Sequence, residues 1–173
     1  MGTALQMRIF TIGHSTRPLD ELIGLLRENG IARLADIRRY PGSRRYPHFS
    51  RESLAQSLPS AGIEYAHLPD LGGRRTPEKN SPNTAWRNAQ FRGYADYMTS
   101  PAFRAALEEL LSDTRPTAIM CAEAVPWRCH RNLVADELLR RGHEVIHILG
   151  PGATQPHVMN PLARVENDRL VYR

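Results

Sequence analysis

Both cysteines of the chain lie in one short segment that carries several other reactive side chains. Cys121 ends an apolar run, and Cys129 stands eight positions later beside His130 and Arg131, with Glu123 between the two thiols. Positively charged neighbours favour the thiolate form of a cysteine, which is the form that attacks electrophiles and binds metals. The segment therefore predicts thiol chemistry assisted by an imidazole, a carboxylate and a guanidinium.

The predicted surroundings of the two cysteines differ. Cys129 falls at the start of a predicted helix next to Arg128, where the helix dipole and the positive charge would favour its thiolate, so it is a candidate nucleophile. Cys121, at a strand end, is by itself expected to be buried and unreactive. Two alternatives stay open: a polar network that only holds the loop, and a metal site formed by Cys121, Cys129, His130 and His14.

The spacing of the cysteines argues against two familiar motifs. The residue six positions after Cys121 is Trp127, where a phosphatase loop would carry an arginine. No close C-x-x-C pair is present, which argues against a standard zinc site. The sequence therefore predicts neither a bound metal nor a cofactor.

Other polar side chains stand at or near the ends of predicted strands. In strand order they are His14 with Ser15, Asp36 with Arg38, Asp70 with Gly72 and Gly73, Cys121 with Glu123, and His147. The carboxyl ends of parallel strands share one edge of the sheet, and open α/β proteins bind their ligands there. The candidate catalytic residues are accordingly His14, Asp36, Cys121, Glu123, Cys129 and His130.

Residues 33–51 contain six arginines and a single acidic residue, Asp36, and aromatic residues such as Tyr40 and Tyr46 are interleaved with them. Arginine forks hold phosphate groups and aromatic rings stack on bases, so this composition is typical of contact with nucleotides or nucleic acids. A solvated loop, in a chain whose single lysine is Lys79, is the alternative. The candidate substrate-binding residues are Ser15, Arg38, Arg44, Arg45, Gly72, Gly73, Arg74 and Arg131.

Hydrophobic periodicity predicts strands that alternate with helices. Strands are expected at residues 7–13, 31–37, 63–68, 117–121 and 145–149. Helices are expected between Pro18 and Asn29, after a capping Ser50, and at residues 91–98, 101–111 and 128–141. Residues 69–90 form a long polar loop, functional or mobile, and the tail from Gly150 is irregular before a hairpin at 162–172 that turns at Asn167-Asp168.

This order of elements predicts a single α/β domain over residues 1–173, with residues 1–6 as a candidate disordered end. The expected architecture is a mostly parallel β-sheet flanked by helices, with a small C-terminal hairpin. The 173 residues, 41% of them hydrophobic, suit one core, and no apolar run approaches the roughly 20 residues of a membrane span. No signal-peptide pattern is present, so we expect a cytoplasmic protein with reduced cysteines and no membrane partner.

Several motifs are spread along the chain: Thr11–Thr16, Asp36-Ile37-Arg38 with Pro41 and Ser43-Arg44, Leu71-Gly72-Gly73, Phe91–Ala95, Cys121-Ala122-Glu123, Cys129-His130-Arg131 and Met159–Arg164. Together they resemble the domain of unknown function 488 family over nearly the whole chain. The resemblance implies a small bacterial or archaeal cytosolic α/β domain and assigns no reaction. The signature positions that it implies are His14, Ser15, Asp36, Arg38, Gly72, Gly73, Cys121, Glu123, Cys129, His130 and Arg131.

The residues leave several functions open. The leading hypothesis is a hydrolase-like enzyme that acts on a phosphate-bearing substrate, either DNA, RNA or a nucleotide, with Asp36 or Glu123 as general base. Hydrolysis directed at a nucleobase is one version of it. The alternatives are a cysteine-dependent enzyme on a small anionic substrate and a non-catalytic nucleic-acid-binding module. The oligomeric state is not predicted.

Overall fold

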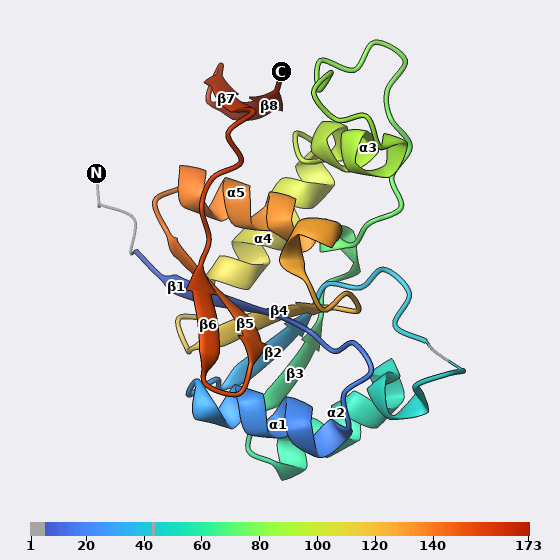
Figure 1. Ribbon diagram of the computed structural model, residues 1–173, viewed down its shortest axis with the longest axis vertical. Coiled ribbons are helices and arrows are strands. Elements are labelled where there is room, and N and C mark those ends of the chain that lie inside the picture. Colours follow the sequence, from blue (N-terminus) through green and yellow to red (C-terminus); the bar gives the residue numbers. More distant parts are fainter. Residues whose placement is uncertain (1–5, 43) are drawn as a thin grey trace.

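The computed structural model describes residues 6–42 and 44–173 of the chain, and its centre is a six-stranded sheet (Figure 1). The strands lie in the order β3-β2-β4-β1-β5-β6, and the first five of them in the chain run parallel. Their bounds are β1 Arg8–Gly13, β2 Arg33–Asp36, β3 Glu64–His67, β4 Thr117–Cys121, β5 Glu144–Gly150 and β6 Ala153–Pro156. The predicted α/β class and mostly parallel sheet are confirmed, whereas the expected disorder of residues 1–6 falls almost wholly outside the described residues.

Strand β6 was not predicted, because the tail from Gly150 was expected to be irregular. It pairs antiparallel with β5 after a turn that contains Gly152, whose φ is 64°. All four residues of β6 are exposed, so the segment shows no alternation of apolar and polar residues that could mark a strand. The sheet is therefore mixed at this edge.

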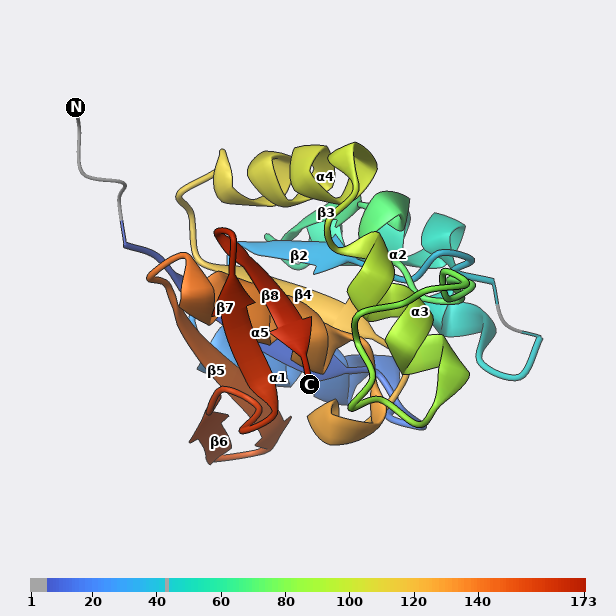
Figure 2. The same cartoon turned by 90° about the horizontal axis from the view of Figure 1, so that it is seen from above.

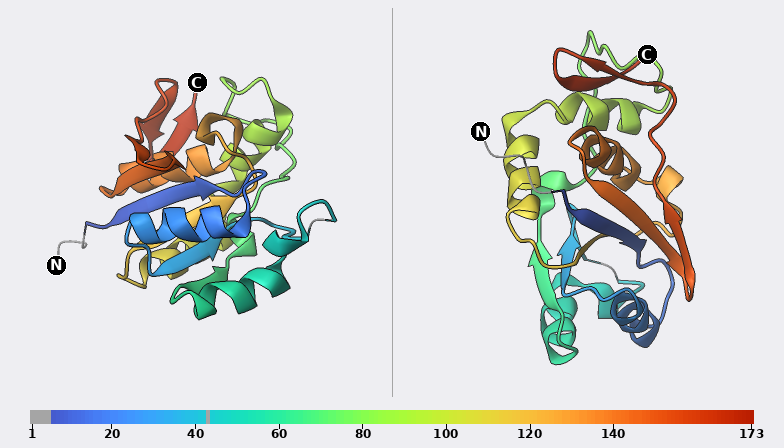
Figure 3. Two further views of the ribbon diagram at one scale, coloured as in Figure 1. Left: turned by 60° about the horizontal axis from the view of Figure 1, so that its bottom comes forward. Right: turned by 90° about the vertical axis from the view of Figure 1, so that its left-hand side faces the viewer.

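Helices cover both faces of the sheet, as Figures 2 and 3 show. Helices α1 (Leu19–Glu28) and α2 (Arg51–Ser60) pack on one face, and Ser50 caps α2 as predicted by accepting from the backbone N–H of Ser53. Helices α3 (Ala89–Tyr97), α4 (Pro101–Leu111) and α5 (Arg131–Arg140) pack on the other. Two apolar cores result, one on each side of the sheet.

Strand β4 divides its side chains between these two cores. Ala118 and Met120 join the core with α1 and α2, whereas Ile119 and Cys121 join the core with α3, α4 and α5. This alternation follows from the two-residue period of a strand. It places the Cys121 thiol on the side of the sheet where α5 begins.

The predicted helix at residues 128–141 is shorter than expected. A single 3₁₀ turn covers Pro126–Arg128, Cys129 is extended with φ −132° and ψ 147°, and α5 begins only at Arg131. The 3₁₀ turn is closed by a hydrogen bond from the Cys129 N–H to the Pro126 carbonyl. No glycine or proline marks position 129, so the sequence carried no signal of this break.

The C-terminal hairpin is confirmed at the predicted turn. It consists of β7 (Ala163–Glu166) and β8 (Arg169–Tyr172), joined through Asn167 and Asp168. Both turn residues have positive φ, which is the geometry of the tight turns that favour Asn and Asp. Leu170 and Tyr172 from β8 complete the core against α5 (Figure 2).

The long loop expected at residues 69–90 begins with a 3₁₀ turn at Pro69–Leu71 and runs without helix or strand to α3. Asp96 of α3 ties it down by accepting hydrogen bonds from the Glu78 N–H, the Ser81 hydroxyl and the Asn83 amide. Within the described residues, none of the helices has the length and apolar character that crossing a membrane requires.

Candidate functional site

The two cysteines meet at the carboxyl end of β4. The Cys129 Sγ lies 2.7 Å from the Cys121 Sγ, and both thiols are buried and free. The adjacency arises because the extended link after the 3₁₀ turn brings Cys129 back over the end of the strand. Sequence spacing could not show this contact, since it depends on the path of the loop between residues 122 and 128.

Arg131 sets the electrostatics of the thiol pair. Burial alone would raise the pKa of Cys121, but the hydrogen bond from Cys129 and the Arg131 guanidinium outweigh it and lower that pKa to about 7. Burial raises the pKa of Cys129 well above its ordinary value, and its hydrogen bond to Cys121 acts in the same direction. Cys121 is therefore the thiol of the pair that ionises first, with its thiolate and thiol forms in comparable amounts near neutral pH, whereas Cys129 stays protonated.

The residues alone pointed to Cys129 as the thiol with the lowered pKa and left either cysteine open as the attacking thiol, whereas in the structure the pKa is lowered at Cys121 and raised at Cys129. Cys129 stands just before α5, and its sulfur accepts a hydrogen bond at 3.4 Å from the backbone N–H of Arg131, but this contribution does not offset the effect of burial on its pKa. Arg131, two residues later, instead directs its Nη1 to the Cys121 sulfur at 2.7 Å. Arg131 lowers the pKa of both thiols, but its guanidinium donates directly to the Cys121 sulfur only.

Arg131 is fully buried and uses its whole guanidinium. Besides the contact with the Cys121 sulfur, Nη1 donates to the Glu123 carbonyl, Nη2 to the Ala124 carbonyl and Nε to the Thr11 hydroxyl. A buried charge is tolerable only when it is hydrogen-bonded and paired in this way. The guanidinium is consequently fixed between β1, the end of β4 and the loop that follows.

Gly13 allows this close packing at the end of β1. A Cβ at that position would lie 1.7 Å from the Glu123 carbonyl oxygen and 2.9 Å from Nη1 of Arg131. The backbone beyond it continues the pairing with β4, because the N–H groups of His14 and Ser15 donate to the carbonyls of Cys121 and Ala122. Only glycine lets the two segments approach so closely here.

His130 stands beside Cys129 as a neutral imidazole. Its Nδ1 lies 3.5 Å from the Cys129 Sγ, and its ring packs on Tyr94 with a centroid distance of 4.9 Å. Burial lowers the pKa of His130 to about 4. The ring is therefore unprotonated near neutral pH, and its Nδ1 can accept a hydrogen bond from the Cys129 thiol, but so low a pKa makes it a weak general base.

Both thiols open onto a pocket of about 670 Å³, which we call the thiol pocket. His130, Glu123 and Tyr94 also line it, and its rim carries three arginines, Arg39, Arg74 and Arg128. Two large aromatic side chains border the same space while remaining largely exposed: Tyr40 at 62% and Trp127 at 60%. The guanidiniums of Arg39 and Arg74 lie 5.4 Å and 5.8 Å from the centre of the Tyr40 ring.

His14, Asp36 and Arg38 form a separate, closed cluster on the same edge of the sheet. The buried Asp36 carboxylate accepts from Nε and Nη2 of Arg38 at 2.9 Å and 2.8 Å and from the Tyr65 hydroxyl at 2.6 Å. His14 accepts from Arg38 at Nε2 and donates from Nδ1 to the Ser15 carbonyl, and burial lowers its pKa to about 4. Arg38 borders the thiol pocket, but His14 and Asp36 do not.

The other predicted substrate-binding residues are spread around this edge. Gly73 and Arg74 line the thiol pocket, whereas Gly72 packs against the backbone of Arg39. Arg44 and Arg45 are exposed on their loop and do not line the pocket. Arg39 and Tyr94 were not among the predicted site residues, although Arg39 belongs to the arginine-rich segment proposed to hold phosphate and Tyr94 to the Phe91–Ala95 motif.

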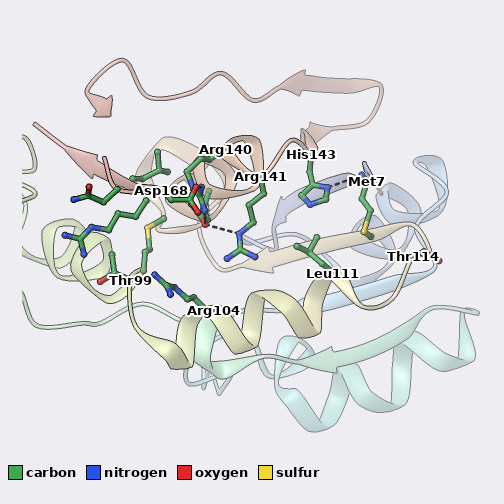
Figure 4. A pocket seen from close by; sticks show the side chains of 14 residues that line it. Met7, Thr99, Arg104, Leu111, Thr114, Arg140, Arg141, His143 and Asp168 are labelled. Carbon is green, nitrogen blue, oxygen red and sulfur yellow. Dashed lines mark hydrogen bonds and ion pairs between the residues drawn. The ribbon is translucent and has the colours of Figure 1, made fainter. Parts of the chain in front are cut away.

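A second hollow, of about 800 Å³, lies near the opposite edge of the sheet (Figure 4). Met7 just before β1 and His143 just before β5 border it, together with arginines of α4, α5 and the hairpin. Glu137 pairs with both Arg140 and Arg141 there, and Asp168 pairs with Arg140. None of the predicted catalytic or substrate-binding residues lines this hollow.

The alternative of a metal site made by Cys121, Cys129, His130 and His14 finds no support. Within residues 6–42 and 44–173, no three His, Cys, Asp or Glu side chains are grouped so that they could hold a metal ion. His14 points instead into its cluster with Arg38.

Comparison with known proteins gives one result. The family model described as "Domain of unknown function DUF488" matches residues 18–138, which include β4, both cysteines and Arg131. Neither among curated proteins nor among solved structures is there a significant match to the chain. The matched segment ends before β5 and the C-terminal hairpin.

Proposed function

Since the chain belongs to the DUF488 family, whose description names no reaction, we propose its function from the site: a cysteine-dependent enzyme that acts on a small anionic substrate. One observation carries the proposal. The Cys121 sulfur receives hydrogen bonds at 2.7 Å from both the Cys129 thiol and the Arg131 guanidinium. A thiolate with a second thiol in contact is the arrangement that thiol–disulfide exchange needs.

The chemistry that this pair supports is reduction of a disulfide in the substrate. The Cys121 thiolate attacks one sulfur of the substrate disulfide, so that a mixed disulfide forms and the other substrate sulfur leaves as a thiolate. Once Cys121 is part of the mixed disulfide, its negative charge no longer opposes ionisation of Cys129, which releases its proton into the thiol pocket and attacks the Cys121 sulfur. The second substrate thiol is released, Cys121 and Cys129 are joined, and the substrate has gained two electrons. A low-molecular-weight thiol restores the dithiol.

The rim of the thiol pocket supports an anionic substrate that also carries a planar ring. Arg39, Arg74 and Arg128 provide positive charge at its border, and Tyr40 and Trp127 offer exposed aromatic faces. Guanidinium forks hold carboxylates and phosphates, and aromatic rings stack on planar groups.

The same rim favours a second candidate, a hydrolase-like enzyme on a nucleotide or a nucleic acid. In that case Glu123 is the better base, because its carboxylate borders the thiol pocket whereas both oxygens of Asp36 are engaged by Arg38 and Tyr65. This candidate requires activity that survives replacement of Cys121, which separates it from the thiol mechanism.

Alkylation followed by mass spectrometry tests the leading proposal. With limiting iodoacetamide near neutral pH, Cys121 is expected to be labelled well before Cys129. Incubation of Cys129→Ser with a small aromatic disulfide that carries carboxylates should trap a mixed disulfide on Cys121, whereas the unaltered protein should resolve it to an internal disulfide. Slow labelling of both thiols, or no mixed disulfide in the Cys129→Ser protein, would rule out the mechanism.

A further inference from the structure

We propose that the thiol site extends beneath the sheet edge through a buried chain of hydrogen bonds that positions Arg131 against Cys121. The chain runs from Arg131 through Thr11, His147 and His157 to Asp136. This proposal rests on the proposed function only because that function is what requires a thiolate at Cys121. It assigns positioning roles to four residues that the thiol mechanism leaves unexplained.

The chain is continuous and closed to solvent. Nε of Arg131 lies 3.3 Å from the Thr11 hydroxyl, which lies 2.6 Å from Nδ1 of His147. Nε2 of His147 lies 2.9 Å from Nδ1 of His157, and Nε2 of His157 lies 2.7 Å from the Asp136 carboxylate. Thr11, His147, Arg131 and Asp136 are all buried, and the His157 side chain is 3% exposed.

The two ends of the chain dictate its direction. Arg131 can only donate, and the Asp136 carboxylate can only accept. The Thr11 hydroxyl therefore accepts from Arg131 and donates to Nδ1 of His147. Each histidine in turn donates from Nε2, His147 to His157 and His157 to Asp136. Every link is then satisfied with both imidazoles neutral and carrying their proton on Nε2.

The surroundings of His147 agree with a neutral ring. Burial, His157 and Arg131 lower the pKa of His147 to about 3. The Asp136 carboxylate also accepts from the Tyr172 hydroxyl at 2.7 Å and from the Asn160 N–H at 3.1 Å. Asp136 is thus a firmly held anion, and the polarised chain connects it with the buried Arg131 cation. Hydrogen bonds aligned in one direction strengthen one another in a low-dielectric interior.

The consequence for Cys121 is a fixed guanidinium. The groups that contact its sulfur directly are Arg131, Cys129 and the Glu123 carbonyl, while the side chains of His130 and Tyr94 border the pocket around it. A lost partner at Nε would leave the guanidinium free to turn about its remaining contacts and would weaken its hydrogen bond to the thiolate. The C-terminal part of the polypeptide, which contributes His147, His157 and Tyr172, would in this way support the active site although it lies beyond the residues that the family model matches.

A pair of substitutions at Thr11 tests the chain without altering any group that touches the sulfur. Thr11→Val keeps the shape of the side chain but removes the hydroxyl, and the pKa of Cys121, followed by the ultraviolet absorbance of the thiolate, should rise by about one unit. Thr11→Ser restores the hydroxyl and should restore the pKa. An unchanged pKa in folded Thr11→Val protein would overturn the proposal.

The tautomers provide a second test that needs no substitution. ¹⁵N NMR of the unaltered protein should find His147 and His157 neutral with the proton on Nε2, and a proton on Nδ1 of either would contradict the direction of the chain. Neither test uses a substrate. If Thr11→Val raises the pKa of Cys121 but the protein reduces no disulfide, the proposed function is refuted and the hydrogen-bond chain stands. If the protein reduces disulfides but Thr11→Val leaves that pKa unchanged, the hydrogen-bond chain is refuted and the proposed function stands.

Discussion

The Arg131 Nη1 and the Cys121 Sγ lie 2.7 Å apart across ten residues of sequence, and both groups are buried. Arginine stays protonated at all accessible pH values, so the charge beside the sulfur does not vary with pH. A lysine or a histidine in its place would lose the charge when buried. The thiolate is therefore stabilised by a permanent cation, and this relationship leads to predictions that can be measured.

Replacing Arg131 should affect stability and reactivity together. Arg131→Met removes the donors of the Glu123 and Ala124 carbonyls and of the Cys121 sulfur, which should cost about 2 kcal/mol or more of the free energy of unfolding. The pKa of Cys121 should return toward that of an ordinary thiol. Urea denaturation and the rate of alkylation near neutral pH measure the two effects. An alkylation rate equal to that of the original protein would show that the guanidinium does not set the pKa.

The free energy of unfolding should increase with pH above neutrality because of Cys121. Its pKa is lowered in the folded protein to about 7 from an unfolded value of 9.0, so the stabilisation is complete above the unfolded value and is lost as the pH falls through about 7. The change is on the order of 2 kcal/mol. Urea titrations between about pH 6 and about pH 9 measure it, and Cys121→Ser, which lacks the titrating group, is the control. Parallel pH profiles for both proteins would refute the lowered pKa.

Gly13→Ala should be severely destabilising. Its Cβ would lie 1.7 Å from the Glu123 carbonyl oxygen, a backbone atom that cannot move aside without displacing the loop beyond Cys121, so we expect a loss of at least about 3 kcal/mol. The matched control is Gly24→Ala, because Gly24 is exposed within α1 and a Cβ there meets nothing within 4 Å. That change should stabilise the protein by up to about 1 kcal/mol. Thermal unfolding compares the two, and equal effects would contradict the close packing at Gly13.

The rim of the thiol pocket should govern affinity for ring-bearing anions. Arg74→Ala and Trp127→Ala are each expected to weaken binding of a fluorescent nucleotide by about tenfold, because a charge or a stacking face is removed. Arg164→Ala on β7, which lines neither hollow, serves as the control. Anisotropy titrations at two salt concentrations, repeated with single-stranded and double-stranded DNA and RNA, measure the effect. Binding that does not depend on salt, or that Arg164→Ala weakens equally, would show that the rim of the thiol pocket does not bind these anions.

Much of the fold was predictable because local sequence rules coincide with the tertiary arrangement. Strand β4 and helix α4 have the predicted bounds, Ser50 caps its helix, and the hairpin turns at Asn167 and Asp168. In each case a propensity, a cap or a turn preference acts within a few residues. Strand β6 was missed because a short, fully exposed edge strand needs no apolar residues.

The composition of the candidate site was partly predictable, and the roles within it were not. Parallel strands bring their carboxyl ends to one edge, so the gathering of polar residues there followed from the order of elements. Which thiol is ionised depends on where a long side chain points. Arg131 crosses to Cys121 rather than to its sequence neighbour Cys129, and no local pattern encodes that choice. The partnership of Thr11 with His147 likewise arises only when β1 and β5 pair.

The division of β4 between the two cores has a consequence for how such a protein can diverge. Cys121 shares a face with Ile119, whereas Met120 belongs to the opposite core. Insertion of a single residue within the strand before Met120 would place the methionine where the thiol now stands, and deletion of one would place Ala122 there. Either change would turn the sulfur toward α1 and α2. Insertions and deletions in this part of the polypeptide should therefore be confined to the loops on either side of β4. Within the strand, a shift by an odd number of residues would move the thiol to the other face of the sheet.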